Sequence, residues 1–201
     1  MKPTTLTGIV LALVLSLAVP TRVSAQWWLS LELGSERFWG ASLETTPERR
    51  SLRPYRPTTV TAGLDHWSRN LGYGLRLRYT DASMGLEGED AVVAVKGVFS
   101  VVSIWPEVSY RLATVGGNNQ LFIHAGPLLE LWSLVDQESR TRLGAQGAVS
   151  LSIPLGSRIG LSLSADVAIT PSPFNDGELD STYELRRLGR RGFAGGLQYR
   201  L

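Results

Sequence analysis

Two histidines are the residues of this chain best suited to acid–base chemistry. His124 falls on the polar face of a predicted strand, beside Glu130 and within reach of Glu107. A histidine among carboxylates can titrate near neutral pH, so His124 is a candidate proton-exchanging or gating group. The alternative is a buried histidine whose ring nitrogens are satisfied by hydrogen bonds.

His66 and Ser68 lie two residues apart, a spacing at which a base can contact a hydroxyl nucleophile. Both border the segment 68–70, which predicts a tight turn, and turns favour serine for backbone reasons. We therefore interpret the pair as a boundary histidine and a turn serine. We predict no catalytic residue and no enzyme, and a lipid-modifying enzyme that uses Ser68 and His124 is the less favoured alternative.

The sequence predicts no metal site and no cofactor. The chain has no cysteine, which excludes disulfides, thiolate metal sites and cysteine nucleophiles. Two acidic groups in predicted loops lack the spaced glycine and final glutamate of a calcium loop. They are Asp81, Glu87, Glu89 and Asp90, and Asp176, Glu178 and Asp180.

Arginine carries most of the positive charge, and two arginine clusters fall in or near predicted loops. Guanidinium groups match the geometry of phosphate oxygens, so phosphate contact and ordinary solvation are equally weighted interpretations. The clusters are Arg49, Arg50, Arg53 and Arg56, and Arg186, Arg187, Arg190 and Arg191.

Residues 1–25 have the features of a cleaved secretory signal. Lys2 precedes an apolar run from Gly8 to Val19, and Val23-Ser24-Ala25 supplies the small residues of a cleavage site. The run is shorter than the roughly 20 residues of a transmembrane helix, which disfavours the alternative of an uncleaved anchor. Cleavage would remove two cations and lower the net charge from +2 to 0, which argues against nucleic-acid binding. We predict one domain over residues 26–201.

After residue 25, apolar and polar residues alternate with the period of β-strands. The alternation predicts eight strands joined alternately by tight turns and by longer polar loops, the latter including 36–56, 81–96 and 171–182. The predicted strands cover about 27–33, with an extension to 43 as the alternative, 57–67, 71–80, 98–112, 121–134, 140–153, 159–170 and 183–201.

The polar face of these strands carries small residues and sparse charges of both signs, where a water-facing sheet would carry many lysines and glutamates. We interpret it as the interior of a barrel, where the charges must pair, and the apolar face as the exterior. Trp27, Tyr110 and Tyr199 lie near strand ends, as interfacial aromatic residues do. The alternative is a soluble lipocalin-like barrel. The predicted lumen charge network is Glu32, Asp65, Arg76, Arg78, Glu107, Arg111, His124, Glu130, Arg142, Asp166, Arg186 and Arg190.

The final strand carries the most specific resemblance. Phe193, Leu197, Tyr199 and the terminal Leu201 alternate, and this resembles the insertion signal of small outer-membrane barrels of the OmpA/OmpX kind. These barrels usually end in Phe, from which Leu201 departs. The resemblance implies an all-β, eight-stranded antiparallel up-and-down transmembrane barrel in the bacterial outer membrane, inserted by the barrel-insertion machinery.

We therefore expect a non-enzymatic, monomeric barrel with a side-chain-filled lumen. Its surface loops would serve envelope integrity, adhesion or ligand binding. Its expected partners are outer-membrane lipid and lipopolysaccharide, whose phosphates the arginine clusters match. A narrow pore or a conduit for hydrophobic solutes is the alternative function.

Overall fold

The structure is a computed structural model, and it describes residues 26–44, 51–87, 92–134, 139–175 and 183–201. Nearly all of these residues lie in strands, so the predicted all-β fold is confirmed. Among the described residues, no helix is long and apolar enough to cross a membrane. The strands are β1 (Gln26–Glu44), β2 (Ser51–Ser68), β3 (Leu71–Glu87), β4 (Val92–Val115), β5 (Asn119–Leu134), β6 (Arg140–Pro154), β7 (Ile159–Thr170) and β8 (Tyr183–Arg200).

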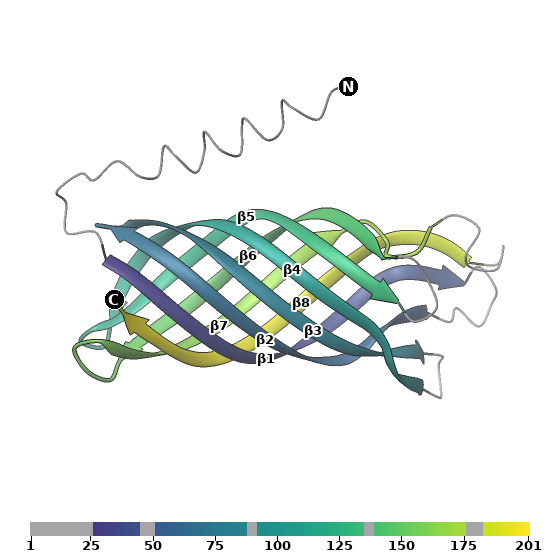
Figure 1. The fold of residues 1–201 in the computed structure, drawn as a ribbon, viewed down its shortest axis with the longest axis horizontal. Coiled ribbons are helices and arrows are strands. Elements are labelled where there is room, and N and C mark those ends of the chain that lie inside the picture. The colour runs from purple at the N-terminus through teal and green to yellow at the C-terminus, as the bar shows by residue number, and fades with distance from the viewer. Residues whose placement is uncertain (1–25, 45–50, 88–91, 135–138, 176–182) are drawn as a thin grey trace, which may run out of the picture.

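The eight strands form a closed barrel. Each strand pairs antiparallel with its neighbour in the chain, and β8 returns to pair with β1. Figure 1 shows the tilted strands around the ring, with the start of β1 and the C-terminus at the same end. Every strand therefore has a hydrogen-bonding neighbour on both sides, as a β-structure in lipid requires.

The apolar face lies outside and the polar face inside. On β3, Leu77 and Tyr79 are about half exposed, whereas Arg76, Arg78 and Thr80 are buried. A soluble barrel would bury the leucines and expose the arginines, so the lipocalin-like alternative is wrong. An apolar exterior is stable against hydrocarbon, and closed barrels of this kind are integral proteins of bacterial outer membranes.

The two ends of the barrel differ. The turn end holds the start of β1, the C-terminus and three tight links, one of them Arg69–Asn70 between β2 and β3. Arg69 has φ 57°, and Gly116 and Gly117 between β4 and β5 have φ 54° and 94°, values that suit tight turns. The opposite, loop end carries the remaining connections.

At the loop end, the strands are longer than the sequence predicts. Most of the predicted loops 36–56 and 81–96 is strand, leaving connections over 45–50 and 88–91. The lengths run from 12 residues in β7 to 24 in β4, whereas about 9–11 residues cross a bilayer. The outward-facing residues above the lipid need not be apolar, so the alternation that identifies a strand fades there.

A β-bulge interrupts the pairing of β1 with β8 near the loop end. Gly40 pairs with Leu188 and Ser42 with Leu185, so two residues of β8, Arg186 and Arg187, lie opposite one of β1. Gly40 has φ 82°, which an L-residue with a side chain rarely adopts. The bulge shifts the alternation of β8 by one residue, which decides where the arginines of this strand point.

Candidate functional site in the barrel lumen

Arg76 of β3 is the centre of the first ion-pair cluster in the lumen. Its Nε donates to Glu107 Oε1 at 2.9 Å, and its Nη2 lies 3.4 Å from Asp65 Oδ2. Its Nη1 lies 3.6 Å from Glu32 Oε1 and 3.4 Å from Ser30 Oγ. Strands β1, β2 and β4 thus each supply a carboxylate to one buried guanidinium.

Arg78, two residues further along β3, forms the second cluster. Its Nη1 donates to Glu36 Oε1 at 2.6 Å, its Nη2 to Asp166 Oδ1 at 3.0 Å, and its Nε to Thr61 Oγ1 at 3.1 Å. Asp166 lies on β7, across the barrel from β3. Arg78 therefore joins opposite walls of the lumen.

Arg190 of β8 extends this cluster. Its Nη1 donates to Glu130 Oε1 at 2.9 Å, and its Nε faces Glu36 Oε1 at 3.4 Å. Its Nη2 donates to Gln146 Oε1 at 2.8 Å, and Gln146 Nε2 donates to Asp166 at 3.3 Å. Arg78 and Arg190 share Glu36 directly and Asp166 through Gln146. We call the three arginines and their six carboxylates the charged layer.

The charged layer fills the middle of the lumen. All nine of its side chains are buried, and a void beside Glu32, Arg76, Arg78 and Asp166 measures about 10 Å³, at most about the space for one water molecule. Charges removed from water are stabilised only when they are paired and hydrogen-bonded. Six carboxylates face three guanidiniums, so loss of one arginine would leave carboxylates without a counter-charge.

His124 of β5 borders the charged layer on the turn-end side. Its Nδ1 lies 3.0 Å from Glu107 Oε1 and 2.7 Å from Ser109 Oγ, and its Nε2 lies 2.7 Å from Ser150 Oγ. A carboxylate, imidazole and serine in this order also occur in acyl-transfer sites, but those sites need N–H donors for an oxyanion. Around Ser150, backbone groups of β5 and β6 pair with each other in the sheet, and the nearby charged layer is rich in carboxylates. The geometry therefore supports a hydrogen-bonded packing histidine.

An aromatic layer closes the lumen between the charged layer and the loop end. Trp132 lies 6.1 Å from both Phe38 and Phe99, and Phe99 lies 6.3 Å from Phe174, measured between ring centroids. Trp132 Nε1 donates to Glu130 Oε2 at 3.0 Å, which joins this layer to the charged one. The aromatic layer consists of Phe38, Phe99, Val101, Trp132, Phe174 and Leu188, all buried.

Phe174 reaches the lumen from the segment that follows β7. Two arginines of β6 hold this segment: Arg140 Nη1 donates to Pro173 O at 2.7 Å, and Arg142 Nε donates to Ser172 O at 2.7 Å. Arg142 Nη2 also donates to Asn175 Oδ1 at 2.7 Å. The loop segment 171–175 is thus fastened to the barrel wall with its phenylalanine inside.

The turn end of the lumen is hollow by contrast. A polar cavity of about 380 Å³, which we call the vestibule, lies between the charged layer and the turns. Asp65, Arg76 and His124 line its inner part, and Gln26, Arg111 and Arg200 are among the residues nearer the turns. Among the described residues, the lumen is therefore open toward the turn end and filled by side chains in the charged layer and in the layer next to it on the loop-end side.

Three predicted members of the lumen charge network do not belong to the charged layer. Arg111 lines the vestibule with its guanidinium 5.8 Å from the centre of the Phe122 ring, and it makes no ion pair with a described residue. Arg142 lies at the loop end and binds the 171–175 segment. Arg186 lies outside, about half exposed, with Glu184 at 3.0 Å, because the bulge turns it outward and Leu185 inward. The prediction that these three pair within a lumen network is wrong.

The other predicted members come together in the lumen: Glu32, Asp65, Arg76, Arg78, Glu107, His124, Glu130, Asp166 and Arg190. Glu36, Gln146 and the aromatic layer were not predicted. Glu36 and Phe38 follow Glu32 at even positions of β1, so extending the alternation beyond Leu33 would have found them. Nothing in the sequence points to Phe174, which lies outside the strands.

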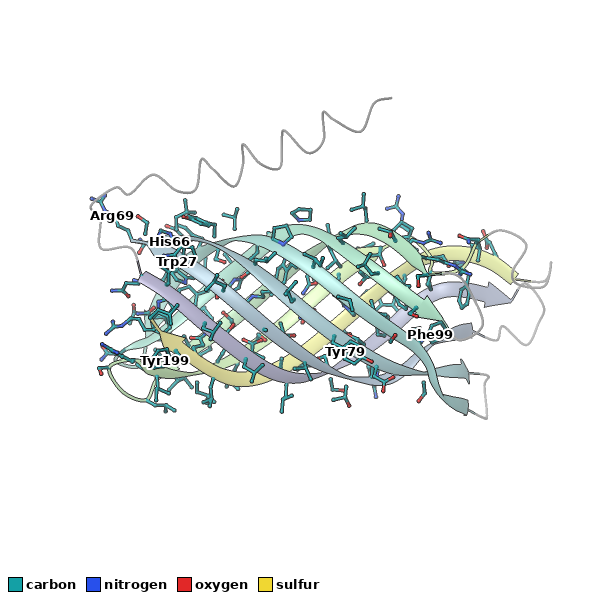
Figure 2. The ribbon with its side chains drawn as sticks, in the orientation of Figure 1. Trp27, His66, Arg69, Tyr79, Phe99 and Tyr199 are labelled. Carbon is teal, nitrogen blue, oxygen red and sulfur yellow. The ribbon has the colours of Figure 1, made fainter. Side chains whose placement is uncertain are left out.

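The predicted outer aromatic residues lie on the outer face at the turn end. Trp27, Tyr110 and Tyr199 are 42%, 49% and 40% exposed. Figure 2 shows Trp27, His66 and Tyr199 near this end and Tyr79 further along the barrel. The side chains of the predicted insertion signal, Phe193, Leu197, Tyr199 and Leu201, are also exposed.

His66 packs against aromatic residues on the outer face, with its ring centroid 4.7 Å from that of Trp27 and 4.8 Å from that of Tyr73. Its Nδ1 has no hydrogen-bond partner among the described residues, so Ser68 is not activated through that atom.

Several predicted loop residues or their side chains lie outside the described part of the chain: Arg49, Arg50, Arg53, Arg56, Glu87, Glu89, Asp90, Asp176, Glu178 and Asp180.

No protein-family model matches this chain, and no curated protein sequence does. Neisserial surface protein A is similar in structure, with 11% identity, TM-score 0.53 and coverage of 89% of this chain and 99% of its own. The outer membrane protein OprG from Pseudomonas aeruginosa has 8% identity, TM-score 0.54 and coverage of 88% and 96%. The outer membrane protein AlkL, determined in DMPC bilayers by solid-state NMR, has 12% identity, TM-score 0.54 and coverage of 91% and 93%. At these identities the likeness concerns the fold, which is that of a small outer-membrane β-barrel of the OmpA/OmpX kind.

Proposed function

We propose that this chain is a non-enzymatic outer-membrane barrel whose closed lumen makes it a rigid support for surface loops. The observation that carries the proposal is the double closure of the lumen by the charged layer and the aromatic layer. Each layer joins several strands, so together they brace the wall from within. The loops would then serve envelope integrity, adhesion or ligand binding.

Planar-bilayer conductance tests this proposal. Wild-type protein should show no steady single-channel current, because a lumen filled with side chains leaves no continuous water path. The double variant Phe99→Ala/Phe174→Ala should also be silent, because the charged layer still blocks the path. A steady current through the folded wild-type protein would contradict the proposal.

The vestibule favours one second candidate, a narrow pore, since its polar lining does not suit the conduit for hydrophobic solutes that is the other form of this alternative. Its cavity of about 380 Å³ would be half of such a path. The other half would require both layers to move apart. Current that appears only in Phe99→Ala/Phe174→Ala would identify the aromatic layer as the gate of this second function.

We further propose that residues 1–25 are removed on export and that the barrel-insertion machinery recognises β8. The outward side chains Phe193, Leu197, Tyr199 and Leu201 support this role, since they remain on the surface of the finished barrel. Mass spectrometry of protein purified from outer membranes should find Gln26 at the N-terminus. Phe193→Ser should lower the amount of heat-modifiable, folded protein in that membrane.

A further inference from the structure

Two arginines face each other on the outer surface of the barrel. Arg37 of β1 pairs in register with Arg191 of β8, and both side chains are exposed. Directly opposed residues in an antiparallel pair have Cβ atoms about 5 Å apart, and like charges in this position destabilise the sheet. A feature that opposes folding in this way calls for a compensating anion.

The same surface holds another arginine and a tryptophan. Arg187 is exposed because it alternates in step with Arg191 on the outward side of β8, and Trp39 is 43% exposed. A Cβ at Gly189 would meet the indole of Trp39, so the ring lies across β8 between the positions of Arg187 and Arg191. We call Arg37, Arg187, Arg191 and Trp39 the outer arginine patch.

The patch has no counter-charge among the side chains that the structure describes. Among the described residues, no ion pair joins Arg37, Arg187 or Arg191 to a carboxylate. The nearby Glu184 pairs with Arg186 at 3.0 Å. Within this part of the chain, the three guanidiniums thus face the exterior without a carboxylate to neutralise them.

The position of the patch identifies the kind of anion. Phe193, 70% exposed, lies two residues from Arg191 on β8, and Leu33, 63% exposed, lies four residues from Arg37 on β1. Two residues of a strand span about 7 Å, so the charges lie at the edge of the apolar band, at the depth of lipid headgroups. This edge faces the loop end, which in an outer-membrane barrel is the outer leaflet.

We propose that the outer arginine patch binds a phosphate group of the phosphorylated glycolipid of the outer leaflet, with the phosphate between Arg37 and Arg191. Guanidinium groups bind phosphate oxygens through two parallel N–H bonds, and an indole is favoured at the interface beside them. This inference rests on the membrane orientation in the proposed function. To the proposed function it adds a lipid ligand, bound by the outer surface of the barrel and not by its loops.

Native mass spectrometry of the detergent-solubilised barrel with diphosphorylated lipid A tests the proposal. The wild type should retain bound lipid, and Arg37→Gln/Arg191→Gln should bind at least about tenfold more weakly, because each charge-assisted hydrogen bond contributes more than the free energy of a tenfold change. Dephosphorylated lipid A should bind both proteins equally weakly. Equal binding of diphosphorylated lipid A to both proteins would overturn the proposal.

Arg69→Gln/Arg158→Gln is the matched control, since it removes two exposed arginines at the turn end. It should bind diphosphorylated lipid A like the wild type. A loss equal to that of the patch variant would show general charge attraction and would overturn the site. Heat-modifiable migration and absence of conductance in all variants would show that the proposed function stands even when this inference fails.

The midpoint of urea unfolding gives a second readout, because the shift that Arg37→Gln causes should change sign when lipid A is added. Without lipid A, Arg37→Gln should raise the midpoint, because it removes a like-charge contact. With diphosphorylated lipid A, the same variant should lower the midpoint relative to the wild type, because it loses a ligand contact. The same sign under both conditions would contradict phosphate binding between the two arginines.

Discussion

The charged layer and the aromatic layer close the same lumen by different physics. In the charged layer, three guanidiniums hold six carboxylates, and each partner is needed because the other is out of water. In the aromatic layer, Phe38, Phe99, Trp132 and Phe174 fill volume and make edge-to-face contacts without charge. The stability of the charged layer therefore depends on keeping every ion-pair partner, whereas the stability of the aromatic layer depends on the volume that its side chains fill.

The largest effect should come from removing one cation. Arg78→Leu should lower the free energy of unfolding by about 3–5 kcal/mol, because Glu36 and Asp166 lose their main counter-charge. Urea unfolding in lipid vesicles, followed by tryptophan fluorescence, measures the loss. A loss below about 1 kcal/mol would show that the carboxylates are satisfied without Arg78 and would remove the contrast between the layers.

The second-largest loss of stability should come from removing side-chain volume from the aromatic layer. Phe99→Ala should cost about 3 kcal/mol through the cavity that it leaves, whereas Phe99→Leu should cost less than about 1.5 kcal/mol. The same unfolding assay compares the two variants. If the leucine variant is as unstable as the alanine variant, then ring geometry and not volume determines the stability of the aromatic layer.

Trp132→Phe tests the contact between the layers. The ring volume largely remains, but Glu130 Oε2 loses the indole N–H at 3.0 Å. The expected cost is about 1–2 kcal/mol, which is the cost of an unsatisfied buried acceptor. The double variant Trp132→Phe/Arg190→Leu should lose less unfolding free energy than the sum of the two single variants, since both substitutions remove a partner of Glu130. Additive losses would show that the two layers contribute to stability independently.

The smallest effect should come from Arg186→Gln. Its pair with Glu184 is solvent-exposed, so the change in unfolding free energy should stay below about 0.5 kcal/mol. A loss comparable to that of Arg78→Leu would mean that Arg186 lies inside the barrel as the sequence predicts. This variant therefore checks the bulge that separates Arg186 from Arg190.

The sequence predicts the part of this barrel that lies in lipid. Alternation locates Arg76 and Arg78 inside because Leu75, Leu77 and Tyr79 must face hydrocarbon. It is ambiguous toward the loop end, where a strand need not be apolar on either face, so the sequence leaves open whether Glu36 and Phe38 belong to the first strand or to a loop. It fails at Arg186, since a bulge adds one residue and inverts every assignment beyond it.

The pairing within the lumen was beyond prediction for another reason. The alternation of polar and apolar residues gives the side of the sheet on which a residue lies. It gives neither the position of the residue along the barrel axis nor its partner across the lumen. The contact between Arg78 and Asp166, 88 residues apart, depends on the stagger of all eight strands. The contribution of Phe174 depends on hydrogen bonds from Arg140 and Arg142 to backbone carbonyls, which leave no pattern in the sequence.

The length of the strands sets how far the surface of this protein stands from the cell. The 24 residues of β4 run about 80 Å, and with a tilt near 40° they rise about 60 Å, more than twice the roughly 25 Å apolar band. On this side of the barrel, the paired ends of β2, β3 and β4 extend well beyond the lipid, whereas the 12 residues of β7 rise only about 30 Å. The wall of the barrel therefore ends at different heights around the ring, and its highest described part lies on the side of β2, β3 and β4.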